Sequence, residues 1–244
     1  MKVGVVVFPG SNCDRDALYA ARLAGAEAVP LWHEEADLHG ADLIVLPGGF
    51  AYGDYLRAGA LARFSPIMGA VEAHARRGGL VLGICNGFQV LAEAGLLPGA
   101  LLRNASLRFE HGWVRLTVTR RDTPFTAAIP DGRTLRLPVA HGEGCYFLPE
   151  TELDALEARG GVLFRYALPE GNPNGSLRDV AGVLDGGGRV CGLMPHPERA
   201  VEALLGSDDG LLVLRSLVAS AASTVVAGAV QVGPGAGQAG SGGA

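Results

Sequence analysis

The stretch Gly79-Leu80-Val81-Leu82-Gly83-Ile84-Cys85-Asn86-Gly87-Phe88-Gln89 begins as an apolar run and ends in the pattern Gly83-x-Cys85-x-Gly87. Apolar residues at helical spacing follow it. A short strand, a cysteine between glycines and a helix are together typical of a nucleophile elbow. Glycines let the backbone turn tightly, and the start of a helix favours a thiolate. We therefore predict that Cys85 is a nucleophile; the alternative is an ordinary buried cysteine.

Strand and helix patterns alternate through the first 95 residues, which include this stretch. Residues 3–8 form a continuous apolar run of the kind found in strands buried on both faces. Residues 27–32 and 42–46 are further strand candidates, with helical patterns between the strands. This order predicts an α/β fold with a doubly wound, mostly parallel sheet. Ligands of such sheets bind beyond the carboxyl ends of the strands.

The carboxyl-terminal half has a different pattern. Residues 111–119 and 134–139 alternate polar and apolar side chains, which indicates antiparallel strands. Residues 180–184 and 190–194 resemble a hairpin closed by Asp185-Gly186-Gly187-Gly188. We predict an antiparallel extension of the parallel sheet, and a final helix from about residue 209 to 218.

The chain end is dominated by small residues. No charged residue follows Arg215, and residues 228–244 contain seven glycines in seventeen positions. We predict a domain of residues 1–220 and a flexible Gly/Ala-rich tail of residues 221–244. Residues 216–232 are too short and too weakly apolar for a membrane span, so no membrane association is expected.

Composition excludes several classes of function. The 244 residues are 48% hydrophobic and 18% charged, with a net charge of −5, so a nucleic-acid partner is not expected. Lys2 is the only lysine, which excludes the lysine of a phosphate-binding loop and an internal Schiff base. The chain is therefore not a self-sufficient ATP-driven enzyme of the phosphate-loop type.

The cysteines indicate a reducing compartment. Cys13, Cys85, Cys145 and Cys191 are far apart and form no Cys-x-x-Cys pair. A disulfide scaffold or a zinc site is therefore not expected. Met1 leads directly into the first predicted strand, which leaves no room for a targeting segment. We predict a cytoplasmic protein without a bound metal.

A cysteine nucleophile needs a base, and the base needs an orienting group. His196 is followed two positions later by Glu198. In an extended segment these residues face the same side, with Cα atoms roughly 7 Å apart, and Pro197 stiffens the backbone between them. We predict a Cys85–His196–Glu198 triad; the alternative is that His-Pro-Glu merely begins a helix.

The reaction of such a triad develops an oxyanion that needs two donors. The amide of Asn86, directly after the nucleophile, is the first candidate. The second is Gly49 in the turn Pro47-Gly48-Gly49, where glycine allows a close backbone approach. Without the other motifs, the Pro47-Gly48-Gly49 turn would indicate only the end of a strand.

The motifs together resemble the class I (triad) glutamine amidotransferase family. Further motifs narrow the resemblance. In chain order they are Phe8-Pro9-Gly10-Ser11-Asn12-Cys13-Asp14, Pro47-Gly48-Gly49, Gly83 to Gln89, Pro138-Val139-Ala140-His141-Gly142-Glu143-Gly144 and Met194-Pro195-His196-Pro197-Glu198-Arg199. With these motifs, the chain is similar to the family of glutaminase subunits of phosphoribosylformylglycinamidine synthases, from residue 1 to about residue 220 and in the family's order.

The resemblance implies a flavodoxin-like fold and hydrolysis of glutamine to glutamate and ammonia through a Cys85 thioester. It also implies that Gln89, Gly142 and Glu143 contact the substrate. Ammonia would pass to a separate, large synthetase subunit that converts formylglycinamide ribonucleotide to formylglycinamidine ribonucleotide in purine synthesis. A small bridging subunit would complete the complex. No cofactor is expected on this chain, with ATP and Mg expected on the partner.

Two alternatives differ in the acceptor or the reaction. A class I amidotransferase subunit of another pathway, such as histidine or pyridoxal phosphate synthesis, would have the same catalytic residues. The Pro-Gly-Ser-Asn-Cys-Asp segment and Asn86 argue against it. A cysteine-elbow stress protein or peptidase would share the sheet but would not need His-Pro-Glu near the carboxyl end.

Overall fold

The computed structural model describes residues 1–230 of the chain. Its main feature is a nine-stranded sheet in the order β2-β1-β3-β4-β11-β10-β9-β6-β7, and a separate pair is formed by β5 and β8. The strands are β1 (Lys2–Val7), β2 (Glu27–Trp32), β3 (Leu43–Leu46), β4 (Leu80–Ile84), β5 (Ala100–Leu102), β6 (Glu110–Val118), β7 (Leu135–His141), β8 (Cys145–Phe147), β9 (Val162–Ala167), β10 (Val180–Leu184) and β11 (Val190–Leu193).

The sheet has a parallel part and an antiparallel part. β2, β1, β3, β4 and β11 pair in parallel, whereas β11, β10, β9, β6 and β7 pair antiparallel. The predicted α/β fold with a doubly wound, mostly parallel sheet and an antiparallel extension is confirmed. The predicted hairpin between β10 and β11 is also present.

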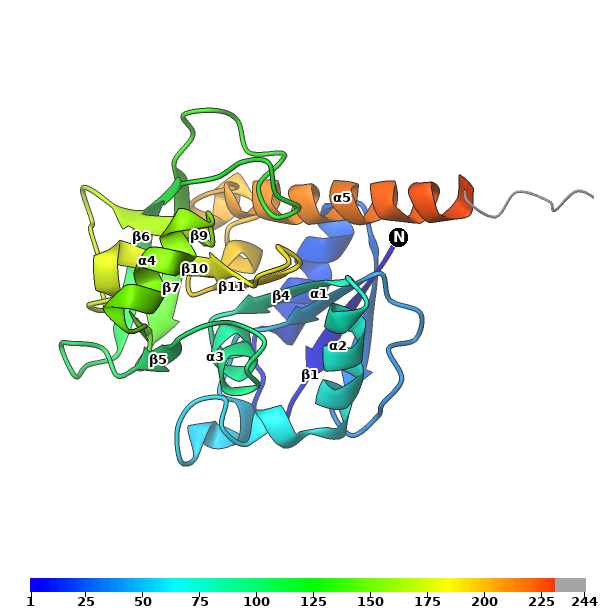
Figure 1. Ribbon diagram of the computed structural model, residues 1–244, viewed down its shortest axis with the longest axis horizontal. Coiled ribbons are helices and arrows are strands. Elements are labelled where there is room, and N and C mark those ends of the chain that lie inside the picture. Colours follow the sequence, from blue (N-terminus) through cyan, green and yellow to red (C-terminus); the bar gives the residue numbers. More distant parts are fainter. Residues whose placement is uncertain (231–244) are drawn as a thin grey trace, which may run out of the picture.

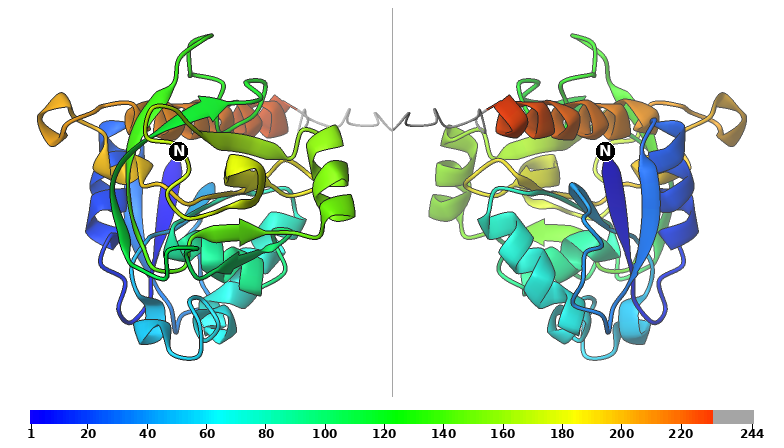
Figure 2. Two further views of the ribbon diagram at one scale, coloured as in Figure 1. Left: turned by 90° about the vertical axis from the view of Figure 1, so that its left-hand side faces the viewer. Right: turned by 90° about the vertical axis from the view of Figure 1, so that its right-hand side faces the viewer.

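Helices cover both faces of the parallel part (Figures 1 and 2). α1 and α5 lie on one side and α2 and α3 on the other, while α4 lies beside the antiparallel strands. This arrangement buries both faces of β1, β3, β4 and β11, which explains their apolar sequences, whereas the edge strand β2 is partly exposed. The helices are α1 (Asp14–Leu23), α2 (Pro66–Arg76), α3 (Asn86–Glu93), α4 (Glu150–Ala158) and α5 (Gly210–Val230).

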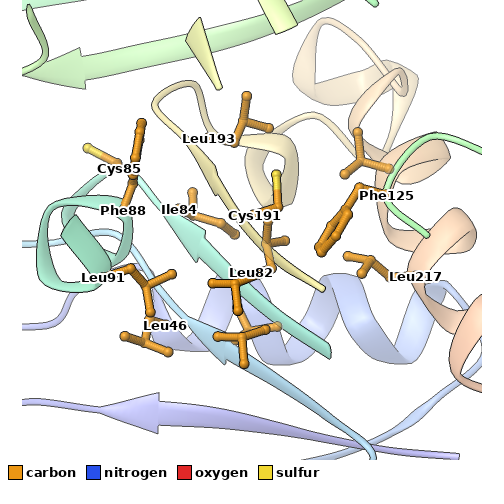
Figure 3. Packing of buried hydrophobic residues seen from close by; sticks show 14 of the residues in the cluster. Leu46, Leu82, Ile84, Cys85, Phe88, Leu91, Phe125, Cys191, Leu193 and Leu217 are labelled. Atoms are coloured by element: carbon orange, nitrogen blue, oxygen red, sulfur yellow. The ribbon is translucent and has the colours of Figure 1, made fainter. Parts of the chain in front are cut away.

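Close packing of α3 on the sheet depends on glycine. Figure 3 shows Phe88 and Leu91 of α3 beside the buried side chains of β3 and β4. A Cβ atom on Gly87 would lie 1.9 Å from the carbonyl oxygen of Leu46, and one on Gly83 would lie 2.5 Å from Leu91. Both glycines that flank Cys85 are therefore required for α3 to approach the strands this closely.

Replacement of Gly87 with alanine tests this packing. The new methyl group meets backbone, which cannot rotate away, so we expect a loss of at least about 3 kcal/mol in the free energy of unfolding. Gly69→Ala is the matched control, because Gly69 also lies in a helix but has nothing within 4 Å of its Cβ position. It should gain about 0.5–1 kcal/mol. Denaturant titration measures both, and equal stabilities would contradict the argument.

The final helix is longer than its sequence pattern suggested. The prediction that it ends near residue 218 is wrong, because α5 continues to Val230 through the first ten residues of the expected tail. Residues 219–230 are rich in alanine and contain no proline, so no proline interrupts the helix there. The remaining part of the predicted tail, 231–244, lies outside the described residues. Within residues 1–230, no helix is long and apolar enough to cross a membrane.

Candidate active site

Cys85 lies in a sharp turn between β4 and α3. Its φ of 49° and ψ of −104° are uncommon for a residue with a side chain, and such strain is characteristic of functional positions. The residue is only 4% exposed, and its Sγ lies 3.8 Å from the carbonyl oxygen of Ala140 at the end of β7. The strand–turn–helix geometry predicted for the elbow is present.

Pairing of β4 with β11 brings the second catalytic candidate to the elbow. Ile84 is in register with Leu193, and the amide of Cys85 donates to the Leu193 carbonyl at 2.8 Å. His196 follows three residues later and donates its own amide to Pro138 O at 2.9 Å. Residues more than a hundred positions apart in sequence thus lie at the same edge of the sheet.

His196 and Glu198 form a buried pair. The ring Nδ1–H donates to Glu198 Oε1 at 2.6 Å, and each residue is 2% exposed. Burial lowers the pKa of His196, but the charge of Glu198 and the neighbouring Cys85 raise it, and the resulting pKa lies well above its ordinary value. The opposite nitrogen, Nε2, makes no hydrogen bond to another described group. The ring therefore has one oriented nitrogen and one available for proton transfer.

A second thiol lies beside the same ring. Cys13 follows the turn after β1, is buried, and contributes to the raised pKa of His196. Donor atoms of Cys13, His196 and Glu198 lie within 4.8 Å of one another. Because the imidazole and the carboxylate are already hydrogen-bonded to each other, we interpret them as an acid–base pair. The absence of a metal stays a prediction. Cys13 belongs to the Phe8 to Asp14 motif that carries the resemblance, but the motif did not indicate that its thiol lies beside His196.

A pocket of about 150 Å³ opens beside Cys85. Four of the five predicted oxyanion or substrate residues line it, and they are Gly49, Gln89, Gly142 and Glu143. Gly49 has a φ of +142°, and a Cβ atom there would lie 2.8 Å from Asn12 N and Ser11 Cα. Glycine is thus required in this wall of the pocket. Phe50, Asp54, Phe109, Ala140 and His141 complete the lining.

Asn86 and Gln89 connect the elbow to the pocket walls. The Asn86 side chain accepts from Ala51 N at 3.0 Å and donates to Gln89 Oε1 at 2.9 Å. Gln89 Nε2 in turn donates to the carbonyl of Glu143 at 2.6 Å. Both polar ends of Gln89 are thus bonded within the protein, which makes it a support of the pocket wall. Its predicted contact with substrate stays a prediction.

Asp54 is a pocket residue that sequence patterns did not reveal. Its Oδ1 accepts from Asn86 Nδ2 at 3.1 Å. Burial and the charge of Glu143 raise its pKa to about 6, against the lowering effect of the Asn86 bond. Asp54 lies in a loop with positive φ at Tyr52, Asp54 and Leu56. The sequence signal that could have pointed to Asp54 is its position, as a charged residue shortly after the Pro47-Gly48-Gly49 turn.

Comparison with known proteins places this geometry in a family. Residues 1–208 match the model of the CobB/CobQ-like glutamine amidotransferase domain. A protein of Rubrobacter xylanophilus named phosphoribosylformylglycinamidine synthase subunit PurQ is 62% identical, covering 91% of this chain and 99% of the relative. A protein of the same name from Gloeobacter violaceus is 55% identical, covering 92% and 100%.

Solved structures have the same architecture. The structure of PurLQS from Thermotoga maritima contains a chain 46% identical to this one, with a TM-score of 0.82, covering 90% of this chain and 98% of that one. A glutamine amidotransferase from Thermotoga maritima, at 21% identity and a TM-score of 0.59, covers 91% and 97% and shares the fold.

Proposed function

This chain belongs to the CobB/CobQ-like glutamine amidotransferase family, and from that premise we propose that it is the glutaminase subunit of a phosphoribosylformylglycinamidine synthase. The observation that carries the proposal is the strained Cys85 elbow beside a buried His196–Glu198 pair, in a chain 62% identical to a subunit of that name. The resemblance deduced from the sequence motifs is confirmed by these relatives.

The geometry supports a thioester mechanism. His196 takes the thiol proton of Cys85 as Sγ attacks the side-chain amide carbon of glutamine, and the amides of Asn86 and Gly49 hold the developing oxyanion. His196 gives this proton to the departing nitrogen, so ammonia leaves and a Cys85 thioester remains. His196 then takes a proton from the water that attacks the thioester, and it returns this proton to Cys85 Sγ as the C–S bond breaks and glutamate is released. Glu198 keeps the ring oriented and stabilises its charged form.

The ammonia is used on another chain. The relatives are named as subunits, and the Thermotoga maritima structure is of PurLQS, which supports assembly with other synthase subunits. A large synthetase subunit would bind ATP, Mg and formylglycinamide ribonucleotide, in agreement with the lack of a phosphate-loop lysine here. A small bridging subunit would complete the complex. Free thiols at all four cysteines agree with a cytoplasmic location.

Active-site labelling tests the proposal. The glutamine analogue 6-diazo-5-oxonorleucine should label Cys85 in the assembled complex, and free glutamine should slow the labelling, because both compounds compete for the pocket at the elbow. Mass spectrometry of the digested chain identifies the labelled cysteine. Cys145 is the internal control, since it is partly exposed but does not line the pocket. Labelling that glutamine fails to slow would contradict the amidotransferase function and favour the stress-protein or peptidase alternative.

A further inference from the structure

The predicted oxyanion donor Gly49 leads into a strained segment of backbone, residues 49–54. Tyr52 has a φ of 56° and a ψ of 27°, Gly53 has a φ of 68°, and Asp54 has a φ of 52°. Left-handed backbone is unfavourable for residues with a side chain, and it persists only where the surrounding contacts determine the conformation. The contacts that hold this segment therefore decide where the Gly49 amide lies.

Three backbone amides tie the segment to the turn after β1 and to the elbow. Phe50 N and Tyr52 N donate to carbonyl oxygens of the turn after β1, at 3.1 Å and 2.6 Å. Ala51 N donates to the side-chain oxygen of Asn86 at 3.0 Å. These bonds fix the backbone on the side of the nucleophile, and the Tyr52 side chain supplies a further anchor.

The phenol of Tyr52 joins the segment to the end of β2 and to the start of α2. Its oxygen lies 2.9 Å from His33 Nδ1 and 2.9 Å from Ser65 Oγ. A hydroxyl group donates one hydrogen bond and also accepts, so it satisfies both contacts at once. The Tyr52 and His33 rings meet edge to face, with centroids 5.6 Å apart. Because His33 and Ser65 are buried, loss of the phenolic oxygen would remove a partner from buried polar groups.

Ser65 uses its hydroxyl for this contact and not to cap its own helix. It is the N-cap residue of α2, where a serine oxygen ordinarily accepts from an amide of the first turn. The Ser65 side chain makes no such bond, and its hydroxyl contacts Tyr52 instead. The backbone carbonyl of His33 accepts from Ile67 N in the first turn of α2 at 3.1 Å. The imidazole and the hydroxyl are therefore held together as one binding site for the phenol.

We propose that Tyr52 is a positioning residue for the oxyanion donor Gly49. Its phenol, held between His33 and Ser65, keeps the Gly49 amide at the pocket beside the nucleophile. The inference rests on the proposed glutaminase function. Tyr52 lies three positions after Gly49 and is not part of the pocket lining, so it acts through the backbone. An oxyanion donor stabilises the transition state only when it is already in place, and a strained segment that loses an anchor relaxes.

Two reactions of Cys85 separate this role from a structural one. Turnover of glutamine develops an oxyanion, whereas alkylation by iodoacetamide displaces iodide from a saturated carbon and develops none. In Tyr52→Phe, kcat for glutamine in the assembled complex should fall by roughly 10-fold or more, since loss of a whole oxyanion donor costs about 10²- to 10³-fold. KM should change little, because the contact matters in the transition state. The rate of Cys85 alkylation, measured by mass spectrometry, should also change little.

Tyr55→Phe is the matched control. It removes a phenolic oxygen from the same loop, and that oxygen is hydrogen-bonded to none of the described residues in a side chain that is 73% exposed. Both of its rates should equal those of the wild type. Ser65→Ala removes one partner of the phenol without removing a helix cap, and it should also lower kcat. The double variant Tyr52→Phe/Ser65→Ala should be no slower than Tyr52→Phe alone, because the two hydroxyls act through one contact.

The outcomes distinguish the inference from the function on which it rests. A Tyr52→Phe variant with the wild-type kcat overturns the inference. Equal losses of glutamine turnover and of alkylation also overturn it, because the defect then lies in the thiol or in the fold. A wild-type complex that uses ammonia but never glutamine would instead overturn the proposed function, and the inference with it. Because both reactions are measured at one thiol on one preparation, a partly folded variant still gives a decisive ratio.

Discussion

Replacement of Cys85 with alanine should lower glutamine-driven synthesis of formylglycinamidine ribonucleotide by roughly 10³-fold or more, the scale of effect seen when a catalytic nucleophile is removed. The thioester requires the sulfur atom, and no other described thiol lines the pocket. Ammonia-driven synthesis should persist, because it uses only the partner's chemistry. The experiment compares the two nitrogen sources in the complex assembled with wild-type and variant chains.

Cys145→Ala provides the control for this experiment. Cys145 is partly exposed, belongs to β8 and donates to the carbonyl of Gly175, away from the elbow. Its replacement should leave both nitrogen sources effective. If Cys85→Ala retains glutamine-driven synthesis, the nucleophile has been misassigned. If it loses ammonia-driven synthesis as well, Cys85 has a role in assembly that the thioester mechanism does not contain.

Glu198→Gln should lower kcat/KM for glutamine by roughly 10²- to 10⁴-fold, as the loss of the orienting charge does in other triads. The carboxylate 2.6 Å from Nδ1 raises the pKa of the buried His196 ring against the opposing effect of burial. Without that charge, the pKa of His196 falls and the protonated ring that forms during the reaction is no longer stabilised. A pH series of kcat/KM for wild type and variant measures both effects.

Glu202→Gln is the matched control, since Glu202 is an exposed carboxylate four positions further along the chain. Its kcat/KM should equal that of the wild type across the pH series. A Glu198→Gln variant with wild-type rate would show that the hydrogen bond alone orients His196. The charge would then have no part in the mechanism, and the assignment of Glu198 as a charged orienting group would be wrong.

The fold was accessible from sequence because its signals are local. The apolar runs of β1, β3 and β4 and the glycines around Cys85 each reflect a constraint that acts within a few residues. The Cys85–His196–Glu198 set was also accessible, because an elbow and a His-Pro-Glu segment both follow strand ends, and parallel strand ends share one edge. The pairing of β4 with β11 that brings them together is a long-range property that sequence patterns did not predict. Only the proximity of Cys85 and His196 was inferred, from the chemistry of a triad.

Other features depend on structure that sequence patterns do not specify. Asp54 lies in the pocket because its loop has positive φ angles at three residues other than glycine. Amino-acid composition does not predict this backbone conformation. The β5–β8 pair was missed because three-residue strands are too short to show alternation. The contact of 3.0 Å between His141 Nε2 and Asn174 Nδ2 joins residues thirty-three positions apart. The length of α5 was underestimated because the tail composition was given more weight than the helix-forming alanines.

The position of β11 has a consequence for how the subunit is made. During synthesis, β4 and the Cys85 elbow leave the ribosome long before residues 190–198. An incomplete chain therefore has the Cys85 thiol without its base, His196. During that interval β4 is an open edge of the growing sheet, because its second neighbour is one of the last strands to be synthesised. Insertion of β11 closes that edge and delivers His196 in the same event. A chain that ends before residue 196 therefore lacks the base that the thioester mechanism requires, and the strand that completes the sheet is the one that precedes this base.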